Sequence, residues 1–189
     1  MEETETMDIM ARAKGLLLDP RREWAIIAAE PADMASMFKN YVVILAGLSS
    51  IAGLLGTLMM SLGVLGFGAV LTSAILGFVL ALVGVFVLSK IIEFLAPRFG
   101  AQADGNAALK LAVYAPTASW VGGMFMVIPW IGWIPALAGG IYSLYLFYIG
   151  TPTVIRIQPD RVMGFAISVV VVAVLVNILI GVVVAGLTR

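Results

Sequence analysis

The sequence predicts an all-α integral membrane protein with five transmembrane helices and a cytoplasmic N-terminus, preceded by short amphipathic interfacial helices. Three observations support this fold class. The 189 residues are 62% hydrophobic and 12% charged, whereas soluble chains average about 45–50% and about 25%. Five long apolar runs follow one another along the chain. If these runs cross a membrane in alternating directions, nearly all basic residues lie on one side of it.

Five apolar segments each approach or exceed the roughly 20 residues that cross about 30 Å of hydrocarbon. They are residues 41–62, 66–95, 107–127, 130–150 and 163–187. The second is apolar over residues 66–89 and is expected to continue as helix to about Leu95. The links at residues 63–65 and 128–129 are so short that the spans they join must form antiparallel hairpins.

The basic residues predict the orientation of these spans. If the spans alternate across the membrane, ten of the eleven Lys and Arg residues lie in regions 1–40, 90–110 and 151–162, and only Arg189 lies opposite. The positive-inside rule makes that basic side the cytoplasm, so the C-terminus is expected outside, in a multi-pass protein of the inner (plasma) membrane. The alternative has four spans, with residues 107–150 partly re-entrant, and it scrambles this partition of charge.

Residues 1–39 are predicted to form a cytoplasmic, interfacial segment before the membrane domain of residues 40–189. From Met7 to Leu18 the pattern is helical, and its apolar residues share one face, which is typical of an amphipathic helix in the membrane interface. These apolar residues are Ile9, Met10, Ala13, Leu16 and Leu17. Asp19 and Pro20 then fit the start of a second short helix that ends near Ala29.

Small residues four positions apart form stripes on three of the spans. Ser49 and Gly53 lie on the first, Gly77 on the second and Gly181 on the fifth. Such stripes let helix backbones approach closely in lipid, so we expect them to pack the bundle. The alternative is a face for a partner membrane protein or for a second copy of this chain.

Four polar residues in or near the spans are candidate functional positions. Lys90 and Glu93 can pair on one helical face near the inner end of the second span, and Lys110 enters the third. We expect these three to anchor the helices at the interface, where lysine can reach water, although intramembrane ionisable groups are often functional. Asn177 lies deep in the last span, where a lone asparagine is expected to bond to another helix rather than to a substrate.

The segment around Pro116 is the most unusual part of the third span. Pro116 removes a backbone hydrogen bond and is expected to kink the helix, while Thr117 and Ser119 can bond to the freed carbonyls. Such a break is tolerated as a plain kink. The alternative is a substrate path, which Lys110, Tyr114, Pro116, Thr117, Ser119 and Asn177 would line.

The residue types present exclude much chemistry. The chain has no Cys and no His, so the usual thiol and histidine-dependent catalytic arrangements and ordinary zinc sites are absent. The spans contain no paired acids for acid–base catalysis. The net charge of zero gives no basic excess for nucleic acid. We therefore expect no enzyme activity, no cofactor, no metal site and no nucleic-acid partner.

Several short segments, in order, resemble the Yip domain family of Ypt/Rab-interacting proteins, and in particular its bacterial branch. The resemblance covers roughly residues 12–185, and it rests on the order and spacing of the segments. The matching segments are Leu18-Asp19-Pro20-Arg21-Arg22-Glu23-Trp24, Ala108 to Thr117 with Tyr114 and Pro116, Ile128-Pro129-Trp130-Ile131-Gly132, and Gly140 to Pro152.

The resemblance implies a five-span membrane protein with a cytoplasmic N-terminus and no enzyme activity. Eukaryotic members are associated with Rab GTPases and with vesicle formation or organelle shape. The N-terminal D-L-Y-G-P type motif of those members is absent here, since residues 17–20 read Leu-Leu-Asp-Pro. A Rab partner is therefore not implied for this chain.

The sequence leaves two hypotheses for function. The first is a non-enzymatic scaffold or adaptor that organises the membrane or partner proteins from the cytoplasmic face. Its expected partners are the lipid bilayer, membrane or cytoplasmic proteins, and further copies of itself. The second is a small transporter or channel, which requires a polar, water-accessible cavity at Pro116.

Overall fold

The computed structural model describes residues 2–62, 64–101 and 104–187, and the side chains of residues 9–62, 64–101 and 104–179. All regular secondary structure in these residues is helical, which confirms the predicted all-α class for this part of the chain. The main helices are α1 (Glu2–Leu18), α2 (Pro20–Ala29), α3 (Met34–Met37), α4 (Val43–Met60), α5 (Phe67–Leu95), α6 (Gly105–Tyr114), α7 (Thr117–Met124), α8 (Trp133–Val154) and α9 (Val162–Leu187). A π-helical turn joins α3 to α4, so that helix is continuous from Met34 to Met60.

Four helical segments are long and apolar enough to cross a membrane. They are Met34–Met60, Phe67–Phe99, Trp133–Val154 and Pro159–Leu179. No more than 28% of the most apolar window of each is buried inside the protein. Most of their apolar surface therefore faces outward, as expected for helices whose solvent is lipid. They correspond to the first, second, fourth and fifth predicted spans.

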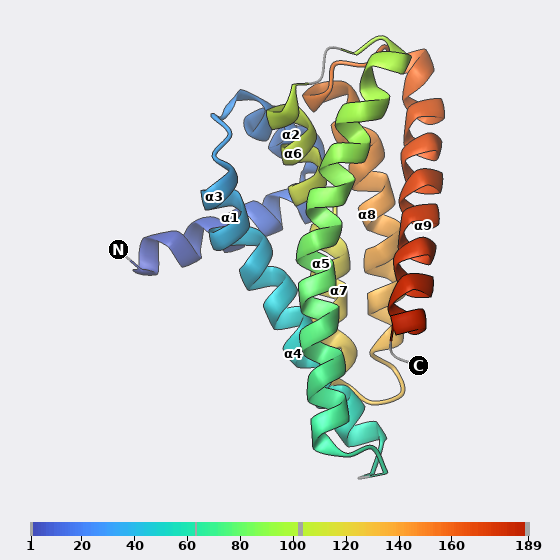
Figure 1. The fold of residues 1–189 in the computed structure, drawn as a ribbon. Helices are drawn as coiled ribbons and strands as arrows, with labels where there is room; N and C mark the ends of the chain where they lie inside the picture. Colours follow the sequence, from blue (N-terminus) through green and yellow to red (C-terminus); the bar gives the residue numbers. More distant parts are fainter. Residues whose placement is uncertain (1, 63, 102–103, 188–189) are drawn as a thin grey trace.

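The third predicted span, residues 107–127, is not a single helix. α6 has 10 residues and α7 has 8, and Ala115 and Pro116 form a turn between them. Neither reaches the roughly 20 residues of a membrane span. Pro116 is the physical cause, because it has no N–H and its ring clashes with the preceding turn. In Figure 1, α6 and α7 nevertheless follow one another along the bundle, from the end where α5 stops to the end where α8 begins.

The fourth span begins at Trp133, later than predicted. The preceding residues form a tight connection in which Trp130 has a φ of 64°, a left-handed conformation incompatible with helix. At its other end α8 runs beyond residue 150 to Val154, with Pro152 inside it. The Thr151 hydroxyl donates to the Phe147 carbonyl at 2.7 Å and so satisfies one acceptor in this last turn.

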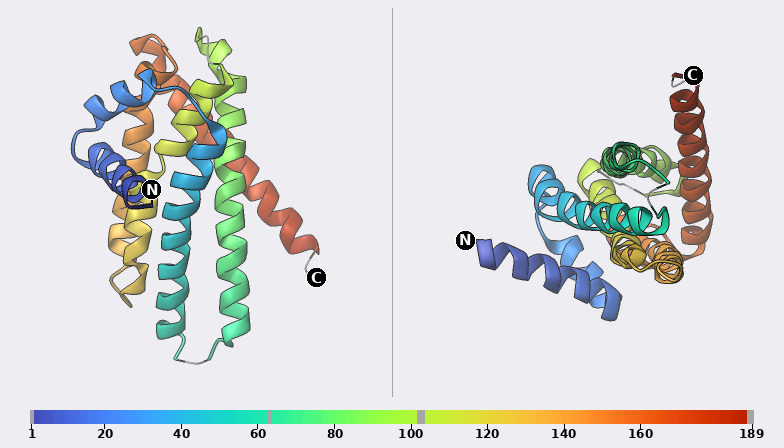
Figure 2. Two further views of the ribbon diagram at one scale, coloured as in Figure 1. Left: turned by 90° about the vertical axis from the view of Figure 1, so that its left-hand side faces the viewer. Right: turned by 90° about the horizontal axis from the view of Figure 1, so that it is seen from below.

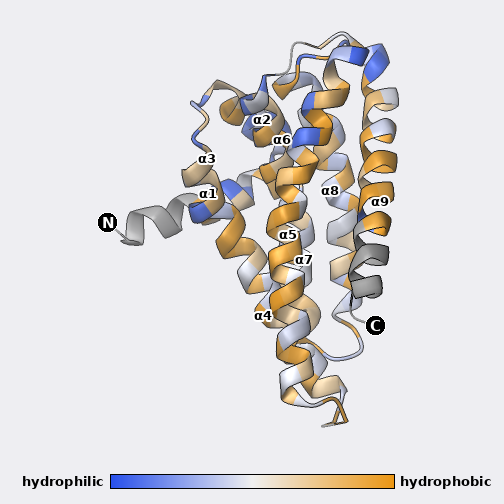
Figure 3. Ribbon diagram, in the orientation of Figure 1, coloured by the Kyte–Doolittle hydropathy of each residue, from blue (hydrophilic) through white to orange (hydrophobic). Residues whose placement is uncertain are grey.

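The helices form an elongated bundle with two different ends. α4 and α5 make an antiparallel hairpin, α7 and α8 make a second, and α9 lies beside α5 and α8 (Figure 1). Hydrophilic residues gather at the end formed by α2, the start of α6 and the connections at 96–101 and 155–161 (Figure 3). We call this the polar end. The remainder of the bundle is mainly apolar along its length (Figure 3).

The first two helices form an arm on one side of the bundle. α1 lies across the bundle axes rather than along them, and α2 lies at the polar end (Figures 1 and 2). The prediction that one apolar face of α1 lies in the interface is wrong in detail. Ile9, Ala13 and Leu16 are buried, whereas Met10 is 73% exposed. Helical geometry explains the split, because Met10 lies about 100° from Ile9 around the helix.

Candidate functional site: the junction between the N-terminal arm and the bundle

Charged side chains are concentrated where the N-terminal arm, defined as α1 and α2, meets the bundle. Arg12 on α1 forms ion pairs with Glu23 at 2.7 Å and with Glu30 at 2.5 Å. Its side chain is only 13% exposed. Burial lowers the pKa of Arg12, but the hydrogen bond and negative charge of Glu30 outweigh it, so the pKa of Arg12 lies above its ordinary value. The Arg12 guanidinium therefore stays charged. It holds α1 to α2 and to Glu30, which follows α2.

Lys110 joins the arm to the bundle from the other side. The sequence favoured a lysine that anchors its helix by reaching water at the interface, whereas the side chain is buried and bonded to the arm. Lys110 is 7% exposed, and its ammonium donates to the carbonyl oxygens of Glu30 and, at 3.3 Å, of Ala28. The physical reason is that α2 ends against α6, and the last carbonyls of a helix need donors from outside it.

Trp24 is the apolar anchor of the arm. Its side chain is fully buried, and its indole ring lies against Gly150 of α8. A Cβ at position 150 would lie 2.5 Å from ring atom Cε2, so only glycine leaves room for the ring. The Tyr142 hydroxyl adds a polar tie, because it donates to the Leu17 carbonyl at 3.0 Å.

The break at Pro116 is built into the same junction. Thr117 is fully buried and its hydroxyl donates to the Tyr114 carbonyl at 2.6 Å, as the sequence suggested for a freed acceptor. The Thr117 oxygen in turn bonds with the Tyr41 hydroxyl at 2.8 Å. The rings of Tyr41 and Tyr114 pack edge to face with centroids 4.8 Å apart, and the Arg12 guanidinium lies 5.7 Å from the Tyr114 ring. The break thus links the first span to the arm.

Ser119 does not take the role predicted for it, because no bond from its hydroxyl to a freed carbonyl is found in the described chain. Its backbone N–H donates to the Ser143 hydroxyl of α8 at 2.8 Å. This bond ties α7 to α8 just below the break.

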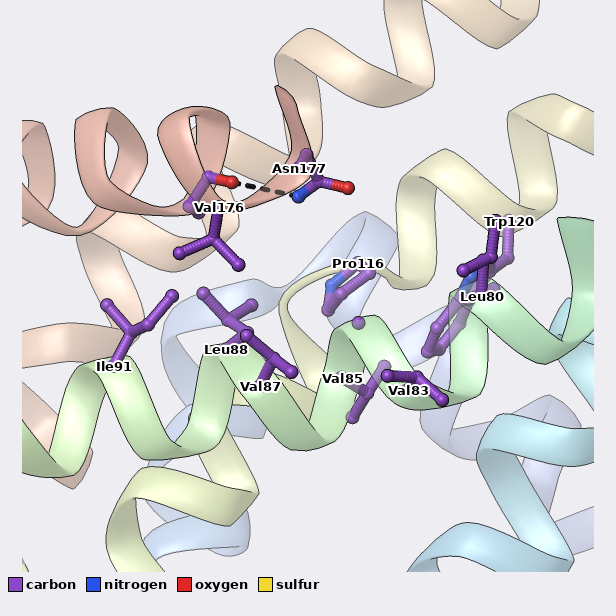
Figure 4. Close-up of a pocket in the computed structure, with 13 residues that line it drawn as sticks. Leu80, Val83, Val85, Val87, Leu88, Ile91, Pro116, Trp120, Val176 and Asn177 are labelled. Atoms are coloured by element: carbon purple, nitrogen blue, oxygen red, sulfur yellow. Dashed lines mark hydrogen bonds between the residues drawn. The ribbon is translucent and has the colours of Figure 1, made fainter. Parts of the chain in front are cut away.

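Two cavities lie beside Pro116, and Figure 4 shows the first of them. The first, about 470 Å³, lies between α5, the break and α9, and the second, about 560 Å³, lies between the break, α8 and α9. Their walls are mainly apolar. Lys110, Tyr114 and Thr117 line neither of them. The residues expected to line a substrate path therefore divide between two separate places.

Asn177 lines both of these cavities. Its side-chain N–H donates to the Ala173 carbonyl of its own helix at 2.9 Å (Figure 4). The predicted bond from Asn177 to another helix does not occur within the described residues. The cause is the lean of α9, which is visible in Figure 2 and separates this part of α9 from its neighbours.

Lys90 and Glu93 form the predicted pair, at 2.8 Å, on the exposed surface of α5. The Lys90 ammonium also lies 5.9 Å from the centroid of the Phe86 ring. Exposed pairs of this kind add little stability. Neither residue touches the arm in any contact that the structure records.

The predicted packing residues behave differently from one another. Ser49 meets α7, because a Cβ at Gly123 would overlap its hydroxyl oxygen. Gly53 and Gly77 face a cavity of about 360 Å³ between α4 and α5, and a Cβ at either would touch nothing. Gly181 lies outside the residues whose side chains and surroundings are described.

Close backbone contacts occur instead at three other glycines. A Cβ would overlap the Met126 carbonyl at Gly56, the Pro135 carbonyl at Gly122 and the Ala118 carbonyl at Gly139. Spacing alone does not distinguish these from other small residues, because the partner backbone is distant in sequence.

The sequence interpretation also missed the charged residues of the junction. Arg12, Glu23 and Glu30 lie in the segment 1–39 that was predicted as interfacial, and no contact between them was predicted. The signal that could have found them is the Asp19-Pro20 turn, which folds α2 back on α1 and brings positions 12 and 23 together. Two polar cavities of about 300 and 320 Å³ flank Glu30, one beside Tyr41 and Tyr114 and the other beside Lys110 and Arg156. In the described chain, no three potential metal-ligating side chains gather.

Comparison with known proteins agrees with this architecture. The chain is 25% identical over 178 residues to the inner membrane protein YohC of Escherichia coli K12, and the match covers 88% of this chain and 90% of that protein. YohC from an O6:H1 strain of E. coli matches to the same extent. No solved structure matches the chain. The family model of the Yip1 domain matches residues 14–181, which include the end of α1, all of α2 and most of the bundle. The chain therefore belongs to the Yip1 domain family of membrane proteins.

Proposed function

We propose that this protein is a non-enzymatic membrane scaffold that presents its N-terminal arm at the cytoplasmic face, where partner proteins or lipids assemble. One observation carries the proposal. The arm is fixed to the bundle on one face and open on the other. Met10, Lys14 and Leu18 are spaced four apart along α1, and all three are exposed, with Met10 and Leu18 each 73% exposed. Residues at this spacing share a helical face.

The arrangement of the junction supports a fixed rather than a mobile arm. Arg12 pairs with Glu23 of α2 and with Glu30, which follows α2. Lys110 donates to carbonyls at the end of α2, and the Trp24 ring packs over Gly150. Because these contacts are several and buried, they hold the arm in place and oppose its local unfolding. Apolar residues exposed on a fixed helix are typical of an interaction surface.

We also propose five membrane crossings, with the polar end in the cytoplasm and the C-terminus outside. In this proposal α6 and α7 cross together as a broken helix. Their run from the end where α5 stops to the end where α8 begins supports it (Figure 1). The positive-inside rule supports the orientation, since the connections at 96–101 and 155–161 carry Arg98, Arg156 and Arg161.

The geometry speaks against transport as the main activity. A path for a polar solute needs polar groups that converge on a water-accessible cavity. The cavities at Pro116 are mainly apolar, and the polar side chains of the break are engaged with the arm and with Tyr41. Tyr114 and Lys110 line separate polar cavities beside Glu30, and these share no lining residue with the cavities at Pro116.

Photo-crosslinking in cells tests the scaffold. A benzophenone amino acid at Leu18 should give a discrete protein or lipid adduct, and Lys14→Glu should abolish it by reversing the charge on the same face. The matched control carries the photoreactive group at Met59, which is exposed on α4 at the other end of the bundle. The scaffold proposal fails if Leu18 gives no more adduct than Met59, or if Lys14→Glu leaves the adduct unchanged.

A further inference from the structure

The buried residues of the last helix lie near its start. Val162, Phe165, Ala166 and Val169 are buried, whereas no residue from Val170 to Leu179 is. Figure 2 shows α9 leaning away from α5 and α8 as it runs toward the C-terminus. The lean opens a space on each side of the helix.

These spaces are the two cavities beside Pro116, and they meet along one line. Both are lined by Leu88, Pro116, Ala173 and Asn177. Leu80, Val83 and Trp120 line only the α5 side, and Leu144, Phe147 and Ile178 line only the α8 side. The close-up of the α5 side shows Val176 and Asn177 facing Leu88 and Pro116 across the space (Figure 4). The two cavities therefore share an inner wall.

The apolar walls restrict which kind of molecule can occupy the two cavities. Water needs two to four polar partners to occupy a cavity, and cavities with aliphatic walls stay dry and take up apolar molecules. The few polar groups are largely engaged, since Ser143 accepts the Ser119 N–H and Asn177 donates to Ala173. The walls continue into the outer, apolar surface of the bundle, because Leu80, Val83, Leu144 and Ile178 are themselves exposed.

We propose that the two cavities form one intramembrane lipid site, in which the acyl chains of a bilayer glycerolipid lie on either side of α9. The surface around the site is apolar and exposed, as expected of a surface that faces lipid, and a gap of this size between helices in a bilayer is open to the molecules that surround it. The occupant is thus a lipid of the surrounding leaflet rather than a soluble ligand.

Asn177 is the polar residue of the shared wall. One N–H of its amide is used within α9, and its second N–H and its carbonyl oxygen make no hydrogen bond in the described chain. Figure 4 shows the oxygen pointing away from the backbone of α9. Glycerolipid esters lie at the edge of the hydrocarbon, about 15 Å from its midplane, whereas Asn177 lies deep in the last span. The groups that meet it there are acyl chains, so we assign the chains to the apolar walls and no ester contact to Asn177.

Tryptophan quenching by brominated acyl chains tests the site in reconstituted bilayers. Trp120 lines the α5-side cavity and is 8% exposed to the outside of the bundle. The variant Trp130→Phe/Trp133→Phe removes the two exposed indoles and keeps Trp24, which is buried in the arm. Adding Trp120→Phe to it isolates the Trp24 signal, so the difference reports Trp120 alone. Dibrominated phosphatidylcholine should quench this Trp120 signal.

Three variants in this background distinguish the site from general lipid contact. Ala173→Phe fills the shared wall and should remove most of the quenching. Val171→Phe adds the same bulk on the exposed side of α9, outside both cavities, and should leave quenching intact. Asn177→Leu makes the shared wall wholly apolar and should leave quenching at least as strong as in the parent protein.

Two results would overturn the lipid site. One is a Trp120 signal that brominated chains do not quench. The other is equal quenching in the Ala173→Phe and Val171→Phe variants. Helical circular dichroism and unchanged Trp24 emission check that Ala173→Phe has not displaced the fold, and if it has, the Asn177→Leu measurement decides alone. Loss of quenching in that folded variant, whose shared wall is wholly apolar, would then overturn the lipid site.

Discussion

The indole of Trp24 lies directly over Gly150, so that the arm packs on α8 at a position where a side chain would exclude the ring. Three ring atoms of Trp24 lie within 2.7 Å of where a Cβ of residue 150 would stand. Trp24 precedes Gly150 by more than a hundred residues. The contact therefore ties the start of the chain to the end of the fourth span.

Replacing Gly150 by alanine should release the arm. The added methyl overlaps a ring held on all sides, and overpacking of a buried site typically costs about 1–3 kcal/mol. Trypsin cleavage after Arg21 and Arg22, both exposed on α2, measures release of the arm in detergent. Gly140→Ala is the matched control, because it lies in the same helix and a Cβ there touches nothing. That control should leave cleavage unchanged, and equal cleavage of the two variants would contradict the proposed contact.

Lys110→Met should loosen α2 while leaving the bundle folded. The substitution leaves the carbonyls of Ala28 and Glu30 without their donor, and hydrogen bonds to charged groups contribute about 1.5–3 kcal/mol. Hydrogen exchange of the α2 amides, followed by mass spectrometry, should accelerate. Lys90→Met removes an exposed pair on α5 and should not alter exchange in α2. Unchanged α2 exchange in Lys110→Met would instead favour the interfacial role first predicted for this lysine.

Thr117→Val should lower the stability of the contact between the first span and the break at Pro116, since it removes the hydrogen-bond partner of the buried Tyr41 hydroxyl. An unsatisfied buried donor costs about 1–3 kcal/mol, whereas removing both partners can be nearly neutral. The double variant Thr117→Val/Tyr41→Phe should therefore recover much of the thermal stability lost by Thr117→Val alone. Thr117→Ser keeps the hydroxyl and should stay close to the parent protein. Additive losses in the double variant would show that the Tyr41 bond contributes nothing.

Local signals account for what the sequence predicted well. Hydrophobic runs of membrane length, proline at position 116 and the Lys90–Glu93 spacing are all visible within one helix. The four uninterrupted spans and the break at Pro116 follow from them. Family membership was visible as well, because the order of short motifs extends over most of the chain.

The junction could not be predicted because its contacts are long-range. Lys110 binds a carbonyl 80 residues earlier in the chain, and Tyr41 pairs with a residue 76 positions later. Periodicity reports which face of a helix is apolar, but not which neighbour covers it. For the same reason Met10 and Ile9 were assigned to one face of α1, although only Ile9 is buried.

Labelling of single cysteines should separate five crossings from four. The chain has no cysteine, so each introduced thiol is the only target for a membrane-impermeant maleimide. With five crossings, Ile131→Cys, in the α7–α8 connection, should label from outside intact spheroplasts, and Gln158→Cys, in the α8–α9 connection, only in inverted vesicles. If α6 and α7 re-enter instead of crossing, both patterns reverse. Leu62→Cys, in the α4–α5 connection, labels from outside in either case and so controls for reagent access. Because the two topologies predict opposite results at two positions, partial labelling at one cannot be mistaken for support.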